Sequence, residues 1–92
     1  MRITAEISLY PLREDFLAKI ESFIGAVRGE SGLEVTVNQM STQIRGELHL
    51  VMSAIERALE SSFAPGEPEV LVAKFLNADL PIAETPDVGT PD

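Results

Sequence analysis

Six polar side chains in two segments of the chain are of types that can bind a small heterocyclic molecule. They are Glu6, Ser8, Tyr10, Asn38, Ser41 and Thr42. Hydroxyl and amide groups hydrogen-bond to the edge of a heterocycle, a phenol ring stacks on it, and a carboxylate offsets a positive ring charge. Serine and threonine on an exposed strand need no ligand, however, because they also suit the strand itself. The pattern alone therefore leaves a ligand site and a plain solvated surface both open.

The groups that most enzymes use are scarce. The chain has no cysteine, which excludes disulfides, thiolate catalysis and cysteine-based metal sites. The single histidine, His49, falls at the start of a predicted helix, where a surface or capping role is the usual one, and no second histidine is present to share a metal. No glycine-rich phosphate loop follows a strand. We expect no enzyme, no metal and no cofactor, although chemistry by carboxylates stays open.

The charge balance favours some partners over others. The formal net charge is −8, and half of that excess lies in residues 78–92, which hold four acids and no base. An acidic surface argues against nucleic acid as a partner and suits a cationic small molecule. No apolar run approaches the length of a signal peptide or of a membrane span. We therefore expect a cytoplasmic protein without membrane insertion.

The first half of the chain predicts a strand followed by a helix. Residues 2–10 alternate apolar and polar side chains, which predicts a strand that buries Ile3, Ala5, Ile7 and Leu9. Pro11 ends this strand, because proline cannot donate to a sheet ladder. From residue 12 to residue 28 the apolar residues recur every three or four positions, which predicts a helix. Glu14 and Asp15 would lie in its first turn, and its apolar stripe is Phe16, Leu17, Ile20, Phe23, Ile24 and Val27.

The rest of the chain predicts two strands, a helix and a last strand. Residues 33–38 and 40–45 alternate, with only Asn38-Gln39 between them, which predicts a hairpin. Its inward residues would be Leu33, Val35, Val37, Met40, Thr42 and Ile44. After Gly46 a second helical stripe follows, comprising Leu48, Val51, Met52, Ile55, Leu59 and Phe63. Residues 69–76 form a last strand that turns Leu71, Ala73 and Phe75 toward the helices.

The element order is strand, helix, strand, strand, helix, strand. This order predicts a ferredoxin-like α+β domain over residues 1–77, with both helices on one face of a four-stranded antiparallel sheet. Residues 78–92 are an acidic, proline-rich tail that we expect to be largely disordered. The sheet face without helices, the open face, would carry polar residues together with Val70, Val72 and Lys74. Such a face is either solvated or meets a second sheet.

Two segments resemble the YkoF-like family, which binds thiamin and its hydroxymethylpyrimidine moiety. The first is I-S-L-Y-P-L at residues 7–12, and the second is M-S-T-Q-I-R-G-E at residues 40–47. They are similar to the family patterns S-L-Y-P-[LM] and [MV]-S-T-x-[IV]-R-G. The resemblance covers about residues 5–75. It implies ferredoxin-like domains whose sheets pair face to face, hence a homodimer or homotetramer, and a binding function rather than catalysis.

Carried over residue by residue, the resemblance points to Ser8, Tyr10, Ser41 and Thr42 as ligand-binding positions. Glu6 and Asn38 are added because they share the same predicted face. The chain departs from the family in having one domain instead of two, and in lacking a Gly-Cys-Pro-Gly-like segment after its last strand. Lys74 would sit beside a cationic ligand unless it pairs with Glu6 or Glu34, or contacts a phosphate.

The sequence thus predicts a non-catalytic protein that binds thiamin or a related pyrimidine in vitamin salvage or transport, as a homo-oligomer with paired sheets. The alternative is an oligomeric interaction or regulatory module that binds no small ligand and uses the open face entirely for contact between sheets.

Overall fold

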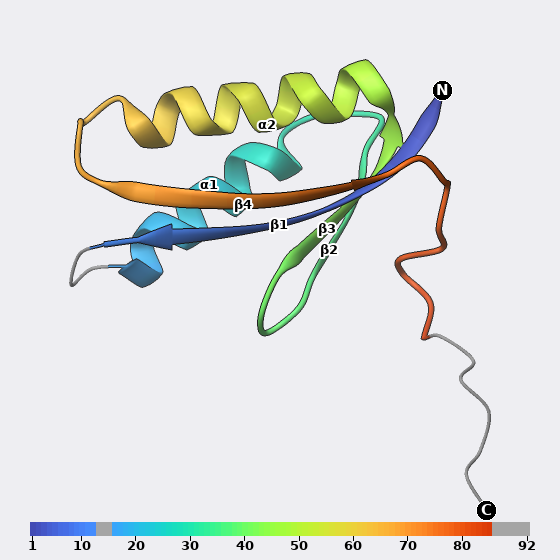
Figure 1. The fold of residues 1–92 in the computed structure, drawn as a ribbon, viewed down its shortest axis with the longest axis horizontal. Helices are drawn as coiled ribbons and strands as arrows, with labels where there is room; N and C mark the ends of the chain where they lie inside the picture. The colour runs from blue at the N-terminus through green and yellow to red at the C-terminus, as the bar shows by residue number, and fades with distance from the viewer. Residues whose placement is uncertain (13–15, 86–92) are drawn as a thin grey trace, which may run out of the picture.

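The computed structural model describes residues 1–12 and 16–85 and has two layers, a sheet and a pair of helices (Figure 1). The elements are β1 (Arg2–Pro11), α1 (Phe16–Arg28), β2 (Glu34–Val37), β3 (Thr42–Glu47), α2 (Leu48–Phe63) and β4 (Glu69–Leu76). The strands form one antiparallel sheet of order β2-β3-β1-β4. The predicted ferredoxin-like α+β fold is confirmed.

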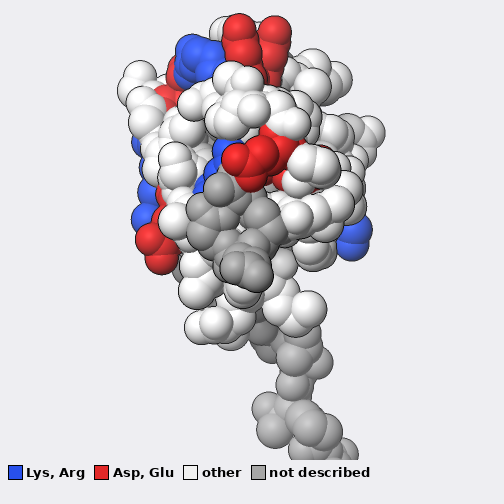
Figure 2. All heavy atoms as spheres, turned by 90° about the vertical axis from the view of Figure 1, so that its left-hand side faces the viewer, with Lys and Arg blue, Asp and Glu red and all other residues white. Residues whose placement is uncertain are grey.

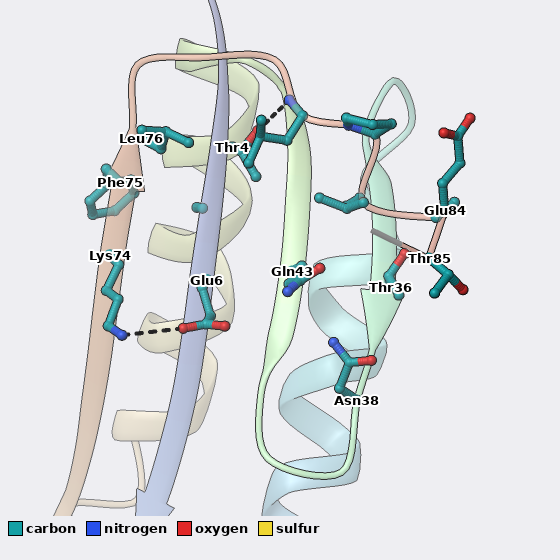
Figure 3. Close-up of a pocket in the computed structure, with 15 residues that line it drawn as sticks. Thr4, Glu6, Thr36, Asn38, Gln43, Lys74, Phe75, Leu76, Glu84 and Thr85 are labelled. Carbon is teal, nitrogen blue, oxygen red and sulfur yellow. Dashed lines mark hydrogen bonds and ion pairs between the residues drawn. The ribbon is translucent and has the colours of Figure 1, made fainter. Parts of the chain in front are cut away.

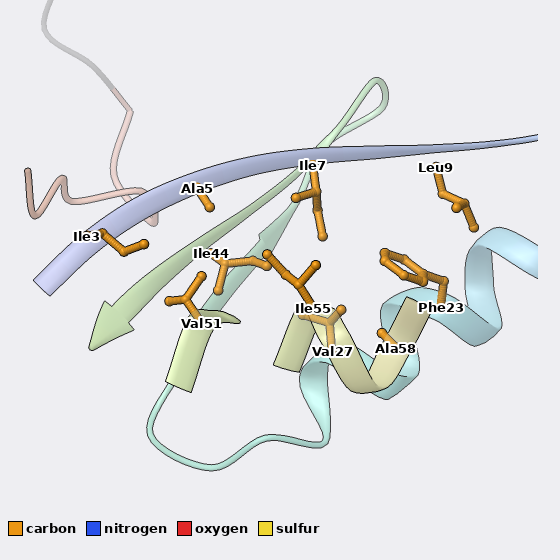
Figure 4. Packing of buried hydrophobic residues seen from close by; sticks show 10 residues of the cluster. All are labelled: Ile3, Ala5, Ile7, Leu9, Phe23, Val27, Ile44, Val51, Ile55 and Ala58. Atoms are coloured by element: carbon orange, nitrogen blue, oxygen red, sulfur yellow. The ribbon is translucent and has the colours of Figure 1, made fainter. Parts of the chain in front are cut away.

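The core lies between the sheet and the helices, and the central strand β1 supplies much of it. Its four predicted inward residues are all buried: Ile3, Ala5, Ile7 and Leu9. Figure 4 shows them turned toward buried residues of both helices and toward Ile44 of β3. A strict two-residue alternation on a central strand is therefore enough to decide which face the helices cover.

The helices pack partly on residues that the predicted stripes did not include. α1 buries Phe23 and Val27 as predicted, while Leu17 is exposed. α2 buries Val51 and Ile55 together with four-residue-spaced alanines, Ala54 and Ala58. Small side chains let two helices approach closely, so alanines can occupy buried positions. The predicted stripe counted only large apolar residues and therefore left these alanines out. Glu14 and Asp15 lie outside the described residues.

The hairpin and the last strand differ from the prediction in detail. The β2–β3 loop spans residues 38–41, longer than the predicted two-residue link, and Met40 is exposed at its tip instead of facing inward. On β4, Leu71 and Ala73 pack against the core, but Phe75 is half exposed. The reason is position: β4 is an edge strand, and the helices pack on β1 and β3.

Gly46, at the end of the third-strand motif, lies against the Leu33 side chain and close to the backbone of Gly32. A Cβ atom at this position would lie 2.6 Å from Leu33 Cδ2 and 3.3 Å from the carbonyl oxygen of Gly32. Real Cβ atoms do not come this near to another carbon. The glycine therefore lets the segment that enters β2 cross over the end of β3.

None of the helices in the described residues is long and apolar enough to cross a membrane.

At the far end of the β1–β3 pair, the ammonium group of Met1 lies 3.0 Å from the carboxylate of Glu47 and lowers the pKa of that carboxyl.

Candidate ligand-binding site

The β2–β3 hairpin leaves the sheet halfway along β1. Pairing between β1 and β3 runs from Arg2 opposite Glu47 to Ile7 opposite Thr42 and then stops. Pairing between β1 and β4 continues as far as Pro11 opposite Glu69. Figure 1 shows the hairpin turning away from the other two strands. The second half of β1 therefore has a neighbouring strand on one side only, and a cleft opens on the other.

This hairpin cleft has a volume of about 470 Å³, within the range of roughly 300–1,000 Å³ that small-molecule sites occupy. One wall is apolar and comes from Leu9 of β1 and from Phe16, Ile20 and Phe23 of α1. The other wall is polar. It contains five of the six residues predicted from the sequence: Ser8, Tyr10, Asn38, Ser41 and Thr42.

Two serine hydroxyls fasten the hairpin tip to β1. Ser8 Oγ donates to the carbonyl oxygen of Met40 at 3.2 Å, and Ser41 Oγ donates to Glu6 Oε2 at 3.1 Å. Both hydroxyl hydrogens are thus used within the chain, which leaves the two oxygen atoms as acceptors. The serines position the cleft as well as line it.

Tyr10, Asn38 and Thr42 occupy different depths of the cleft. Tyr10 is 53% exposed and stands opposite Val70 at the open face, so its ring is available for stacking. Asn38 closes the hairpin by donating its backbone N–H to the Ser41 carbonyl oxygen at 2.8 Å. Thr42 is buried and lies opposite Ile7, on the helix side of the sheet. The predicted residues therefore surround a slot beside β1 and do not share one flat face.

Glu6 stands apart from this group. It does not line the cleft, but its carboxylate accepts from Ser41 at the border of the cleft and lies 3.5 Å from the Lys74 ammonium group. Pairing with Glu6 is one of the roles predicted for Lys74, and the structure shows it. A carboxylate paired with Lys74 thus lies just beyond the polar wall.

Residues 78–85, here called the strap, run back from β4 onto the open face. Thr4 holds the strap with one hydroxyl: it donates to the Ala78 carbonyl oxygen at 2.8 Å and accepts from the Leu80 N–H at 3.0 Å. Arg45 Nη1 donates to the Leu80 carbonyl oxygen at 2.8 Å. The predicted disorder of residues 78–92 stays a prediction, and residues 86–92 lie outside the described part of the chain.

Asp79 adds a charged clamp to these bonds. Its carboxylate accepts from Arg2 Nε at 3.1 Å and lies 2.9 Å from Arg45 Nε, close enough for an ion pair although the Arg45 N–H is not aligned for a hydrogen bond. Glu34 lies 3.6 Å from the same Arg45 nitrogen. The strap is therefore attached to both β1 and β3.

A second cavity, of about 990 Å³, lies between the strap and the open face. Figure 3 shows the side chains of Thr36 and Gln43 in the strands beneath it, that of Asn38 in the hairpin loop, and the Glu6–Lys74 pair at one side. Leu80 and Ile82 of the strap form an apolar wall. Of the six predicted residues, Glu6 and Asn38 line this strap cavity, so Asn38 borders both spaces.

The two cavities differ in charge. None of the described residues that line the hairpin cleft is charged, whereas the strap cavity is bordered by Glu6, Lys74 and Glu84. The described lining of the cleft, with hydroxyl and amide groups on one wall and aromatic rings on the other, suits a neutral aromatic ring with a polar edge. Among the described residues, no group of three histidine, aspartate or glutamate side chains is placed to hold a metal ion.

Charged side chains are also dispersed over the visible surface. Figure 2, which views the molecule from the left-hand side of Figure 1, shows basic and acidic side chains scattered among uncharged atoms, with no continuous basic patch among the coloured and white atoms.

Sequence reasoning missed the contribution of α1. Phe16 and Ile20 belong to its apolar stripe, which predicts core positions, yet they line the cleft, and Phe16 is 46% exposed. The apolar stripe of α1 extends beyond the part of the sheet where β3 still pairs with β1. That shortfall depends on the hairpin's departure from β1, which no local pattern encodes.

Comparison with known proteins shows the family to which the chain belongs. Residues 2–77 match the YKOF-related Family. The chain belongs to this family. The match covers every strand and both helices, including both segments on which the resemblance rests, and the predicted family is therefore confirmed. A search of the curated proteins found no match.

Solved structures share the fold at low sequence identity. A protein from Streptococcus pneumoniae, SP2199, has a TM-score of 0.76 and 19% identity, over 90% of this chain and 92% of its own. A DUF77 domain from Bacillus cereus has a TM-score of 0.71 and 22% identity, over 86% and 78%. A Thermotoga maritima protein provisionally assigned to thiamine biosynthesis or salvage has a TM-score of 0.62 and 17% identity, over 94% and 90%.

Proposed function

We propose that this protein binds thiamin or its hydroxymethylpyrimidine moiety in the hairpin cleft, without catalysing a reaction, and that it serves vitamin salvage or transport in the cytoplasm. Membership of the YKOF-related family and the fold shared with a protein provisionally assigned to thiamine biosynthesis or salvage support the ligand class. The observation that carries the proposal is the hairpin cleft, whose described lining residues carry no charge and gather hydroxyl, amide and phenol groups against an apolar wall.

The two rings of thiamin fit the distribution of charge. The pyrimidine ring is neutral and has donors and acceptors along its edge, so it would occupy the cleft, hydrogen-bonded to Asn38, Thr42 and the serine oxygens. Tyr10 would stack on it at the mouth. The thiazolium ring is cationic and would lie toward the carboxylate of Glu6, which Ser41 joins to the cleft wall. In this arrangement Lys74 remains the partner of Glu6 and does not contact the ligand.

The absence of catalysis is part of the proposal. None of the described residues lining the cleft is histidine, aspartate, glutamate or lysine, the side chains that most often transfer protons near neutral pH. The Ser8 hydroxyl donates to a backbone carbonyl oxygen, and the Ser41 hydroxyl donates to the Glu6 carboxylate, which also pairs with Lys74.

Melting curves recorded with thiamin, thiamin phosphates and hydroxymethylpyrimidine test the proposal. A ligand at 100 times its dissociation constant stabilises the folded state by about 2.7 kcal/mol, which raises the melting temperature of a domain this small by several degrees. We expect a rise with thiamin or hydroxymethylpyrimidine. The absence of any rise with all of these compounds at millimolar concentration would contradict the proposal.

Tyr10→Ala isolates the role of the ring. The side chain is half exposed, so its removal leaves the core intact, and we expect the melting temperature without ligand to change little while the ligand-induced rise is lost. Met52→Ala is the matched control, since Met52 is 45% exposed on α2, away from the cleft, and should keep the full rise. Full affinity in Tyr10→Ala would remove Tyr10 from the site.

The alternative function is an interaction module without a small ligand. The exposed apolar residues of β4, Val70, Val72 and Phe75, favour it, because such residues on a sheet edge commonly form contacts with another chain. We propose homo-oligomer formation in either case, with the open faces of two sheets paired as the family resemblance implies. The strap already covers the part of that face around Thr4 and Arg45.

A further inference from the structure

The two edges of the sheet are protected to very different extents. The β2 edge is four residues long and carries Glu34, whereas the β4 edge is eight residues long and has Lys74 as its single charge between Glu69 and Leu76. Proline, bulges and inward charges usually protect edge strands from pairing with other chains. Between its terminal residues β4 has no proline, and its outer side pairs with no other strand in the described part of the chain.

The hydrogen-bond pattern shows which backbone groups face outward. Leu12 N–H donates to the carbonyl oxygen of Pro68 at 3.2 Å, which continues the β1–β4 ladder by one step. Because residues alternate along an antiparallel ladder, the even-numbered residues of β4 turn their backbone groups toward β1. The N–H and C=O groups of Leu71, Ala73 and Phe75 therefore point away from the sheet.

Apolar side chains accompany this edge on both of its faces. Val70, Val72 and Leu76 are 44–47% exposed on the open face, and Phe75 is 50% exposed on the helix face. A molecule that packs on one face would cover only part of this surface. A strand added to the edge would cover both faces and also satisfy the outward backbone groups.

We propose that β4 pairs with β4 of a second copy of this chain, antiparallel about a two-fold axis at Ala73. Two copies related by such an axis place Leu71 opposite Phe75, and Val70 opposite Leu76, so that large apolar residues meet on each face. Lys74 then stands opposite Val72. An axis at Lys74 would set two ammonium groups against each other, and one at Val72 would set Phe75 against Glu69.

The strap is compatible with this pairing. It leaves the end of β4 and turns onto the open face, where Thr4, Arg2 and Arg45 hold it. It therefore narrows the area available for face-to-face contact but leaves the edge free. The edge pairing goes beyond the proposed function, since it requires no ligand and does not involve the hairpin cleft.

A single cysteine tests the axis, because the chain has none of its own. Opposed residues in an antiparallel hydrogen-bonded pair have Cα atoms about 5.5 Å apart, which a disulfide can bridge. We expect Ala73→Cys to form a covalent dimer on mild oxidation at micromolar concentration. Val37→Cys, on the β2 edge, is the matched control and should remain uncrosslinked.

Sedimentation equilibrium of charge variants tests the register. Val72→Lys introduces two like-charge pairs with Lys74 of the other copy, so we expect the dissociation constant of the dimer to rise about tenfold. Val72→Glu introduces two attractive pairs and should keep the dimer. Thermal melts of both variants verify that each is folded.

Three results would overturn the proposal. The first is a monomer of the unmodified chain at all concentrations, the second a dimer in which Val37→Cys but not Ala73→Cys crosslinks, and the third a dimer equally stable in Val72→Lys and Val72→Glu. None of these results depends on whether thiamin binds. A monomer would also contradict the pairing of open faces proposed above, whereas the other two results concern the β4 edge alone.

Discussion

At the scale of single residues, Thr4 shows how one hydroxyl fixes a segment far away in the sequence. The residue is 7% exposed, and its Oγ donates to Ala78 and accepts from Leu80, so it satisfies two backbone groups of the strap. The ion pairs of Asp79 add little free energy, because its side chain is more than one third exposed and salt screens such pairs. We therefore expect the Thr4 hydroxyl, together with the Arg45 hydrogen bond to Leu80, to contribute more to holding the strap than the ion pairs of Asp79.

Thr4→Val tests whether the hydrogen bonds of Thr4 or the ion pairs of Asp79 hold the strap. Valine keeps the shape of threonine but loses both hydrogen bonds. We expect the free energy of unfolding to fall by about 1–2 kcal/mol and hydrogen exchange at the Leu80 amide to become faster. Thr36→Val is the matched control. Thr36 is half buried on the same sheet, and its hydroxyl makes none of the hydrogen bonds found among the described residues. Unchanged exchange at Leu80 in Thr4→Val would show that the charges hold the strap instead.

Residue types alone predict part of the candidate site. Ser8, Tyr10, Ser41 and Thr42 stand in motifs that the family resemblance identifies, and all four line the cleft. Alternation along β1 predicts Glu6 on the same face as Ser8 and Tyr10, and it lies on that face, at the border of the cleft. The contribution of Phe16 and Ile20 depends on where the hairpin leaves β1, so residue types could not predict it.

At the scale of elements, the end of β3 shows why a motif glycine is needed. Gly46 has a negative φ, so its conformation is open to any residue, and the constraint is space: Leu33 and Gly32 cross over it. The buried side of β3 is formed by Thr42, Ile44 and Gly46. A Cβ atom at the third of these positions would meet the Leu33 side chain and the carbonyl oxygen of Gly32.

Gly46→Ala should therefore destabilise the fold by about 1–3 kcal/mol, through overpacking against Leu33. Gly25→Ala is the control. Gly25 lies within α1, and a methyl group on its Cα would meet no atom within 4 Å, so the substitution should stabilise the protein by about 0.5–1 kcal/mol. Chemical denaturation of the two variants measures both changes, and a loss of stability in Gly25→Ala as large as that in Gly46→Ala would contradict the steric account.

Whether a segment forms a helix or a strand was easier to predict than the residues at which it begins and ends. The sequence places β4 at the observed residues, because Pro68 and Leu76 bound a clear alternation. It places the hairpin strands one or two residues away from their observed positions, because the alternation passes through the turn without a break. The hydrogen bond from Asn38 to Ser41 closes that turn, and it is a property of the folded backbone that side-chain patterns do not reveal.

At the scale of the whole molecule, the order of the elements is enough to predict the fold. Strand, helix, strand, strand, helix, strand allows few arrangements, and the buried alternation of β1 requires both helices on one face. The strap and the hairpin cleft could not be predicted in this way. Both depend on contacts between distant segments, such as Thr4 with Leu80 and Ser8 with Met40, that have no repeating pattern in the sequence.

The central claim is that the hairpin cleft, and not the strap cavity, binds the pyrimidine. Backbone amide spectra of the isotope-labelled protein, recorded while hydroxymethylpyrimidine is added, test it most directly because they report each residue separately. We expect saturable shifts that cluster at residues 8–12 and 38–42, with little change at Leu80 and Ile82 of the strap. Shifts confined to the strap and to Gln43, or no shifts at millimolar ligand, would contradict the claim.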